Sequence, residues 1–341
     1  MKKNSKYSEL HPMKVQVKAG SYAERYYRGA LGLPGVRLPM PKAIAPGVAP
    51  SPIHDLMFHG GKTVPQMQFL NLYVGGAAAW KEEDMASIDK AISAAMTDKR
   101  LNNVIVQYFP GKTISCEFVE AKILPGNPPA VASQGDVEKL LKTLHATATL
   151  GKADRETTIF NFILPRGTVL NTDPSVTGNL SASNGQKVQK TVQRAADSLH
   201  GLGGYHGSVH TTSQGKKATL YYSVDVFSET MANGRENGIA VFDRPWKNVV
   251  ATLYHELNEF RTDADVDDAI AAGNDPAGTN FLGWTSRQGE EIGDRPVFAA
   301  DPLTQVFKQI KLTGKTTTVP IQFQYSNFVH GPEGPIKNPH K

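Results

Sequence analysis

Cysteine is almost absent from this sequence of 341 residues, in which Cys116 is the only one. A single thiol cannot form a disulfide within the chain, which excludes the disulfide-stabilised scaffolds of small secreted domains. Long apolar runs are also missing, because no segment approaches the roughly 18 apolar residues of a membrane-spanning helix. The basic stretch 1–6 is followed by no apolar run, so no secretory signal is visible. We therefore expect a soluble protein without a membrane span that is cytoplasmic, exported without a cleaved signal, or a trimmed mature form.

The sequence also lacks the patterns of nucleotide and nucleic-acid binding. Its formal net charge is +5, but lysine and arginine are scattered and form no basic stripe with aromatic residues between them. The glycine pairs at 60–61, 75–76 and 203–204 lack the spacing of dinucleotide or phosphate loops. We expect no nucleic-acid partner.

Composition divides the chain into three segments. Residues 1–52 are rich in proline from Pro34 onward, which disfavours helices and central strands and predicts an N-terminal arm with a short helix over 22–31. Such an arm is either disordered or wraps this subunit or its neighbour, and the last case predicts a homo-oligomer. Residues 53–325 are expected to form an α/β domain, and residues 326–341 a loose C-terminal tail.

Strand and helix patterns alternate through the middle of the chain. This alternation predicts a single layered α/β domain with a mixed sheet and flanking helices. We expect a hairpin-like segment from 281–284 and 291–298. The predicted strands cover 68–74, 103–109, 113–124, 157–164 and 217–227, and the predicted helices cover 82–97, 135–150, 186–199 and the region that begins at Val249.

The sequence Tyr254-His-Glu-Leu-Asn-Glu259 lies in that last helix and carries the main functional signal. His255 and Glu259 are four residues apart and share one helix face, with Glu256 beside them. Two metal ligands next to an acid are what a zincin-like active-site helix provides, although glutamate replaces the usual second histidine. Asp263 continues the polar strip as a supporting residue. The alternative is a histidine–glutamate pair on a solvated helix face.

A second acidic block follows at Glu290-Glu-Ile-Gly-Asp294. In an extended segment Glu291 faces away from Ile292, so Glu291 points toward the helix when Ile292 enters the core. Glu291 is therefore the preferred third metal ligand, and Asp294 would orient a ligand. The alternative is that both residues cap turns or pair with nearby arginines.

Two histidines in the glycine-rich stretch 203–210 are further candidates. His206 is the alternative third ligand, and His210 is a candidate catalytic group that polarises a carbonyl. The alternative for each is a histidine of a surface loop, and this alternative is stronger for His210 than for His206.

The order of these motifs resembles the phosphate-induced protein 1 family, also called EXORDIUM-like proteins. The resemblance rests on Gly-Tyr-His206, on His-Glu-Leu-x-Glu ending at Glu259, on Trp284, and on Glu-Ile-Gly-Asp ending at Asp294. It covers about residues 55–300 and implies an extracellular location connected with the cell wall, without an assigned chemistry. The chain departs from the family at Arg295, where a cysteine usually follows the acidic block, and in lacking a visible signal peptide.

Two hypotheses follow. In the first, the protein is a metal-dependent hydrolase of peptides or cell-wall glycans, with Glu256 as general base and zinc as the preferred ion over manganese or calcium. In the second, it is a non-catalytic module in which the same residues hold a structural metal or a polar network, and it acts by self-assembly or partner binding.

Overall fold

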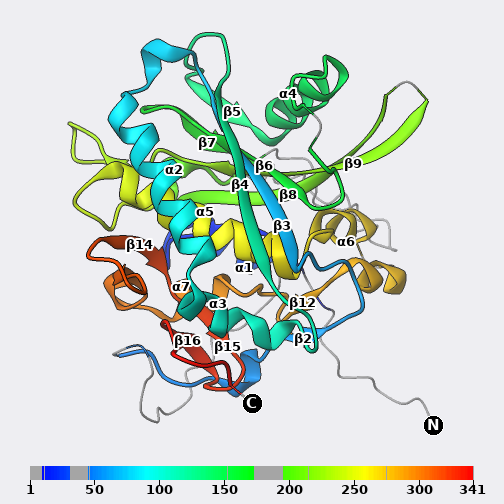
Figure 1. The fold of residues 1–341 in the computed structure, drawn as a ribbon, viewed down its shortest axis with the longest axis vertical. Coiled ribbons are helices and arrows are strands. Elements are labelled where there is room, and N and C mark those ends of the chain that lie inside the picture. The colour runs from blue at the N-terminus through cyan, green and yellow to red at the C-terminus, as the bar shows by residue number, and fades with distance from the viewer. Residues whose placement is uncertain are drawn as a thin grey trace, which may run out of the picture.

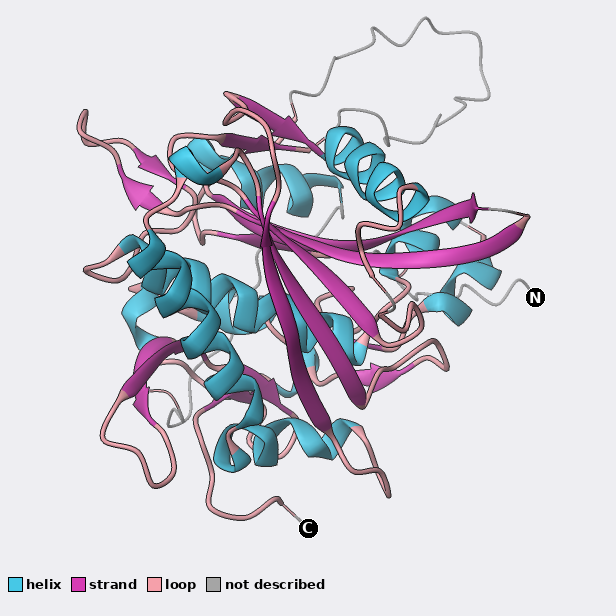
Figure 2. Ribbon diagram, turned by 45° about the horizontal axis from the view of Figure 1, so that its top comes forward, coloured by secondary structure: helices cyan, strands magenta, loops and turns pink. Residues whose placement is uncertain are grey.

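A six-stranded mixed sheet forms the centre of the protein (Figures 1 and 2). The computed structural model describes residues 10, 12–30, 45, 47–151, 153–172, 195–213, 215–273 and 275–340. The strand order is β1 (Val15–Val17), β8 (Leu202–Ser213), β9 (Lys216–Asp225), β6 (Thr158–Ile163), β3 (Gln66–Tyr73) and β4 (Ser115–Ile123). The four strands from β9 to β4 run parallel, and β8 and β1 are added at one edge through antiparallel pairings.

Helices cover both faces of this sheet. The strand β6 alternates accordingly, with Ile159 and Ile163 in one core cluster and Phe160 and Phe162 in the other. The first cluster contains the apolar faces of α2 (Glu82–Thr97) and α5 (Pro245–Thr262), and the second contains those of α4 (Gln134–Ala146) and α1 (Tyr22–Ala30). The predicted layered α/β fold with a mixed sheet and flanking helices is thus confirmed.

The helix α5 is an internal element of the fold. It begins at Pro245. Proline is tolerated in the first turn, because the N–H groups there have no intrahelical acceptor. Val249, Leu253 and Leu257 recur at helical spacing and pack into the first core cluster. Every residue from Asn248 to Thr262 is buried, so the polar side of the helix is enclosed as well as the apolar side.

Smaller elements surround the sheet. The short helices are α3 (Lys99–Ile105), α6 (Val266–Ala272) and α7 (Asp294–Ala299), with 3-10 turns at Pro52–His54, Ala77–Ala79, Val106–Tyr108, Ser198–His200, Pro276–Phe281 and Leu303–Gln305. The paired short strands are β2 (Met57–Phe58) with β12 (Trp284–Thr285), β5 (Val131–Ser133) with β7 (Val169–Asn171), β10 (Glu229–Thr230) with β11 (Glu236–Asn237), β13 (Phe307–Lys311) with β14 (Thr318–Gln322), and β15 (Gln324–Ser326) with β16 (Gly331–Glu333).

The predicted strand at 103–109 is wrong, because this segment lies in α3 and the following 3-10 turn. The side chain of Asp98 accepts hydrogen bonds from the backbone N–H groups of Arg100 and Leu101 at 2.9 and 3.2 Å and starts the helix. A short apolar run does not by itself distinguish a buried helix from a strand.

The predicted hairpin at 281–284 and 291–298 is also wrong. The strand β12 pairs with β2 from the start of the domain, and the returning segment forms α7. The turn between them does close, since the Ser286 N–H donates to the Glu290 carbonyl over 2.8 Å. The chain then turns at Glu291 into α7 and forms no strand there.

The terminal segments are partly integrated into the domain. Within the expected arm, β1 is an edge strand of the main sheet, and the predicted helix at 22–31 is present as α1. The expected loose tail contains β16, and the Ile336 N–H donates to the Arg100 carbonyl over 3.0 Å. Most of the helix predicted at 186–199 lies outside the described residues. Among the described helices, none is long and apolar enough to cross a membrane.

Candidate metal centre

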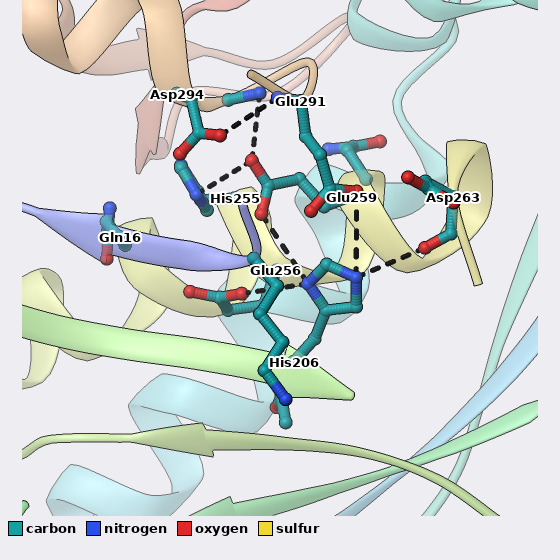
Figure 3. A network of polar contacts seen from close by, with 12 residues as sticks. Gln16, His206, His255, Glu256, Glu259, Asp263, Glu291 and Asp294 are labelled. Atoms are coloured by element: carbon teal, nitrogen blue, oxygen red, sulfur yellow. Dashed lines mark hydrogen bonds and ion pairs between the residues drawn. The ribbon is translucent and has the colours of Figure 1, made fainter. Parts of the chain in front are cut away.

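A cluster of histidine and carboxylate side chains lies between α5, β8 and the start of α7 (Figure 3). His206 comes from β8, and the turn before α7 supplies Glu291. The helix α5 contributes His255 and Glu259, which share one face as their four-residue spacing predicts, and Glu256 beside them. All five side chains are fully buried, at 0% exposure.

His255 is oriented by Gln322, the last residue of β14. Its Nδ1 lies 2.9 Å from the Gln322 Oε1, while the Gln322 Nε2 donates to the Gly293 carbonyl over 2.6 Å. Because the amide oxygen can only accept, His255 carries its proton on Nδ1, and in the neutral ring Nε2 holds a lone pair. Nε2 lies 3.0 Å from the Glu259 Oε1 but makes no hydrogen bond with a described residue.

His206 is held in the same manner by the backbone at the end of α5. Its Nε2 lies 3.2 Å from the carbonyl oxygen of Asp263, which fixes the proton on that nitrogen. Nδ1 then faces two carboxylates, 3.4 Å from the Glu256 Oε2 and 3.6 Å from the Glu259 Oε2. No described residue hydrogen-bonds to Nδ1. The lone-pair nitrogens of both histidines are therefore directed into the cluster.

Glu259 lies between the two histidines. Its Oε1 accepts a hydrogen bond from the Gly293 N–H at 3.1 Å and faces His255, whereas Oε2 faces His206. Burial would raise the pKa of Glu259, but the imidazoles of His255 and His206, when they are protonated, lower it to about 2. This carboxylate is therefore ionised and offers one oxygen to each histidine.

Glu291 completes the cluster from the opposite side. Its backbone N–H donates to the Asp294 Oδ2 over 2.9 Å, which holds the turn at the start of α7. Its Oε1 lies 3.7 Å from the His206 Nε2, and neither carboxylate oxygen accepts a hydrogen bond from a described residue. Ile292 enters the core, so Glu291 is directed away from it and toward α5.

The cluster has more negative charge than its surroundings neutralise. Burial raises the pKa of Glu256 well above its usual range, and the nearby carboxylates of Glu259, Asp225 and Asp294 add to the rise. Burial and Glu259 raise the pKa of Glu291 in the same direction. Buried carboxylates without donors cost several kcal/mol each unless a proton or cation compensates them.

The donor set fits a metal ion. His206, Glu259 and Glu291 form one group, and His255, Glu256 and Glu259 another, with ligand atoms within 4.8 Å of one another in each. Glu259 belongs to both. Ligands of a divalent cation share three features that are present here. Imidazole nitrogens offer lone pairs, carboxylate oxygens lack hydrogen-bond donors, and each imidazole makes a hydrogen bond on its far side.

Glycine residues occupy two positions, Gly293 and Gly204, at which the backbone lies so close to the cluster that a side chain would not fit. A Cβ on Gly293 would lie 2.3 Å from the His255 Nδ1. A Cβ on Gly204 would lie 2.8 Å from the Thr252 Cγ2 and 3.2 Å from the Glu256 Oε1. The turn before α7 and the strand β8 therefore approach α5 without intervening side chains.

The structure does not bring every predicted residue into the cluster. His210 lies further along β8, where its exposed side chain contacts Asp268 at 2.7 Å and Thr219 at 3.0 Å. Asp263 acts through its backbone carbonyl on His206, while its Oδ1 accepts from the Gly283 N–H at 2.8 Å. His206, predicted as an alternative to Glu291, lies beside it.

Gln322 was not identified from the sequence, and neither was Gln16 of β1, whose Nε2 donates to the Gln322 Oε1 over 3.0 Å. Isolated glutamines in unrelated segments carry no spacing pattern, so no local signal could have found them.

Comparison of the chain with protein-family models, with curated proteins and with solved structures found no match in any of the three.

Proposed function

We propose that the protein binds a divalent metal ion in this cluster and is a metal-dependent hydrolase. The observation that supports the proposal best is the convergence of two oriented histidine nitrogens on carboxylate oxygens that no described donor satisfies. His255 and Glu259 are the primary ligands in this proposal. His206 and Glu291, which form a second group with the shared Glu259, would complete the set. Asp294 supports it through the backbone N–H of Glu291.

Zinc is the preferred ion in this proposal. Two imidazole nitrogens with carboxylate oxygens suit Zn²⁺ or Mn²⁺, while Ca²⁺ prefers six to eight oxygen ligands. Bound there, a divalent cation supplies Lewis-acid chemistry that acidifies water and polarises the bond to be cleaved.

Glu256 is the general base of the proposed reaction, since a bound cation would offset the burial and the neighbouring carboxylates that raise its pKa. It lies beside the ligands on α5, and neither of its oxygens accepts a hydrogen bond from a described residue. It takes a proton from the attacking water, whose oxygen forms a bond to the electrophilic carbon. Glu256 then passes this proton to the leaving nitrogen or oxygen as the scissile bond breaks. His210 has no part in this step, because it lies outside the cluster.

The proposed substrate is a peptide or a cell-wall glycan. The resemblance to the EXORDIUM-like family supports a substrate of the cell wall, and the zincin-like arrangement of His255 and Glu256 on one helix supports a peptide. Both classes enter the activity assay below.

A structural metal centre is the second candidate function, and one observation favours it. Every proposed ligand is fully buried, whereas a catalytic site needs an open position for substrate. In this alternative Glu256 is a further ligand and not a base.

A Glu256→Gln variant separates the two candidates. The hydrolase proposal predicts that purified wild type and variant both hold about one divalent ion per chain, and that only the wild type cleaves labelled casein or peptidoglycan fragments. Loss of general-base catalysis should reduce turnover by roughly 100-fold or more. Glu83→Gln, on the exposed side of α2, is the matched control.

A structural ion predicts a different result. Removing it with a chelator lowers the melting temperature of the wild type, because the ion stabilises only the folded state. No hydrolysis is found with either substrate class, and Glu256→Gln weakens ion binding.

A further inference from the structure

The strand β1 covers the sheet edge next to the metal centre. It comes from the start of the chain, and Val15 and Gln16 pair antiparallel with Tyr205 and Gly204 of β8, next to His206. On its other side β1 contacts α7, and the Met13 N–H donates to the Gly289 carbonyl over 3.1 Å. It therefore fills a slot between the strand that carries His206 and the turn that carries Glu291.

Gln16 links β1 to the centre itself. Opposite residues of paired strands point to the same face, so Gln16 shares the side of Gly204, where Glu256 lies. Its side chain is fully buried and donates to the same Gln322 oxygen that faces His255. Figure 3 shows Gln16 on its strand along one side of the cluster.

The side chains of Lys14, directly before β1, and of Val15 and Val17 within it also contact specific parts of the domain. Lys14 is largely buried, forms an ion pair with Asp267 and lies 5.5 Å from the centre of the Tyr205 ring. Val15 and Val17 are buried in the second core cluster. At this edge the chain thus holds an extended backbone by strand pairing, with a basic residue followed by alternating apolar ones.

We infer that the edge of β8 from Leu202 to Tyr205 is a peptide-binding edge, and that residues 13–17 occupy it as an intramolecular ligand. This inference rests on the proposed hydrolase for its substrate class, which becomes an extended peptide with a basic side chain before apolar residues. Strand addition at a sheet edge is an established mode of peptide recognition, in which main-chain hydrogen bonds bind and side-chain pockets select. In this inference β1 contributes to the burial of the centre, because the strand lies where the substrate would enter.

Displacing β1 in the full-length chain tests this inference. Val15→Asp/Val17→Asp places two carboxylates in the apolar core and releases the strand. Val119→Asp is the matched control, since this exposed valine lies in β4 at the other edge of the same sheet. The probe is a fluorescent synthetic peptide with the sequence of residues 12–18, and a second peptide carries glutamate in place of Lys14.

The released variant is expected to bind the probe, and the wild type and the control to bind it at least about tenfold more weakly. The glutamate peptide should bind the variant at least about tenfold more weakly than the probe, because Asp267 would repel it. A variant with the circular dichroism spectrum of the wild type that binds neither peptide overturns the inference.

Hydrogen exchange of the wild type tests the inference even if the variant does not fold. A displaceable strand predicts that the amides of Val15–Val17 exchange at least about 100-fold faster than those of Ile159–Ile163 in central β6. Equal protection of both segments overturns the inference.

Peptide binding is measured with and without prior chelator treatment. Strand pairing does not require the ion, so peptide binding should survive chelator treatment. Peptide binding by protein that contains no divalent ion before that treatment contradicts the proposed hydrolase alone. A released variant that contains the metal ion but does not bind the peptide contradicts only the inference that the β8 edge binds peptides.

Discussion

Gln322 accepts a hydrogen bond from His255, with 2.9 Å between its Oε1 and the histidine Nδ1. The two residues are 67 positions apart in the sequence. The contact leaves the His255 Nε2 as the lone-pair nitrogen of the cluster and aims it at Glu259. The same amide also donates to the Gly293 carbonyl, so one side chain connects the histidine of α5 with the turn before α7.

Replacing Gln322 with methionine should weaken metal binding by roughly 10–100-fold, because His255 loses the partner that fixes its orientation and proton. Competition with a chromogenic chelator measures the affinity. Gln309→Met, at an exposed position of the adjacent strand β13, is the control and should bind as the wild type does. Equal affinity in all three proteins would show that Gln322 does not support a metal ligand.

Gly293→Ala should destabilise the fold by about 1–3 kcal/mol through overpacking. The new methyl group would lie 2.3 Å from the His255 Nδ1, so the ring or the turn must move. Urea unfolding measures the change. At Gly331 the nearest atom to an added Cβ is 3.8 Å away, so Gly331→Ala should be tolerated. Similar stabilities of the two variants would contradict the close packing of the turn against α5.

We expect the carboxyl group of Asp89 on α2 to make the free energy of unfolding depend on pH. Burial raises the pKa of Asp89 above its usual value of 3.8, although Asn71 and Tyr73 donate to its Oδ1 at 2.7 Å each and oppose the rise. Above pH 3.8 the folded protein therefore binds more protons at Asp89 than the unfolded chain does. This contribution to stability is present at low pH and is lost as the pH rises through the raised pKa.

An Asp89→Asn variant has no carboxyl group to titrate at this position. Its stability relative to the wild type should therefore increase as the pH rises from 3.8 through the raised pKa of Asp89. Urea unfolding at a series of pH values gives the comparison, with Asp301→Asn on the surface as the control. A constant difference between variant and wild type across the series would contradict the raised pKa.

Local patterns in the sequence predict much of the fold and the three residues that α5 contributes to the candidate site. The apolar spacing of Val249, Leu253 and Leu257 predicts α5, and this helix alone brings together His255, Glu256 and Glu259. The alternation of strands and helices predicts the layered sheet. These features depend on residues within a few turns of one another.

The remaining features depend on contacts between distant segments. Gln16 and Gln322 are 306 positions apart and meet only because β1 joins the edge of the sheet. His206 and His210 occupy the same strand and look equivalent in the sequence, yet one is fully buried beside α5 and the other is exposed. Which of them reaches the site is decided by where β8 crosses the helix, and no local pattern encodes that crossing.

An anomalous-scattering map of crystals grown with zinc tests the central claim most directly. We predict one dominant peak between the His255 Nε2, Glu259 and the His206–Glu291 pair, at about 2.0–2.2 Å from its ligand atoms. The peak should be lost in crystals of a Glu259→Gln variant prepared in the same way. A wild-type map without density at this position, from protein that also contains no divalent ion by elemental analysis, would contradict the metal centre.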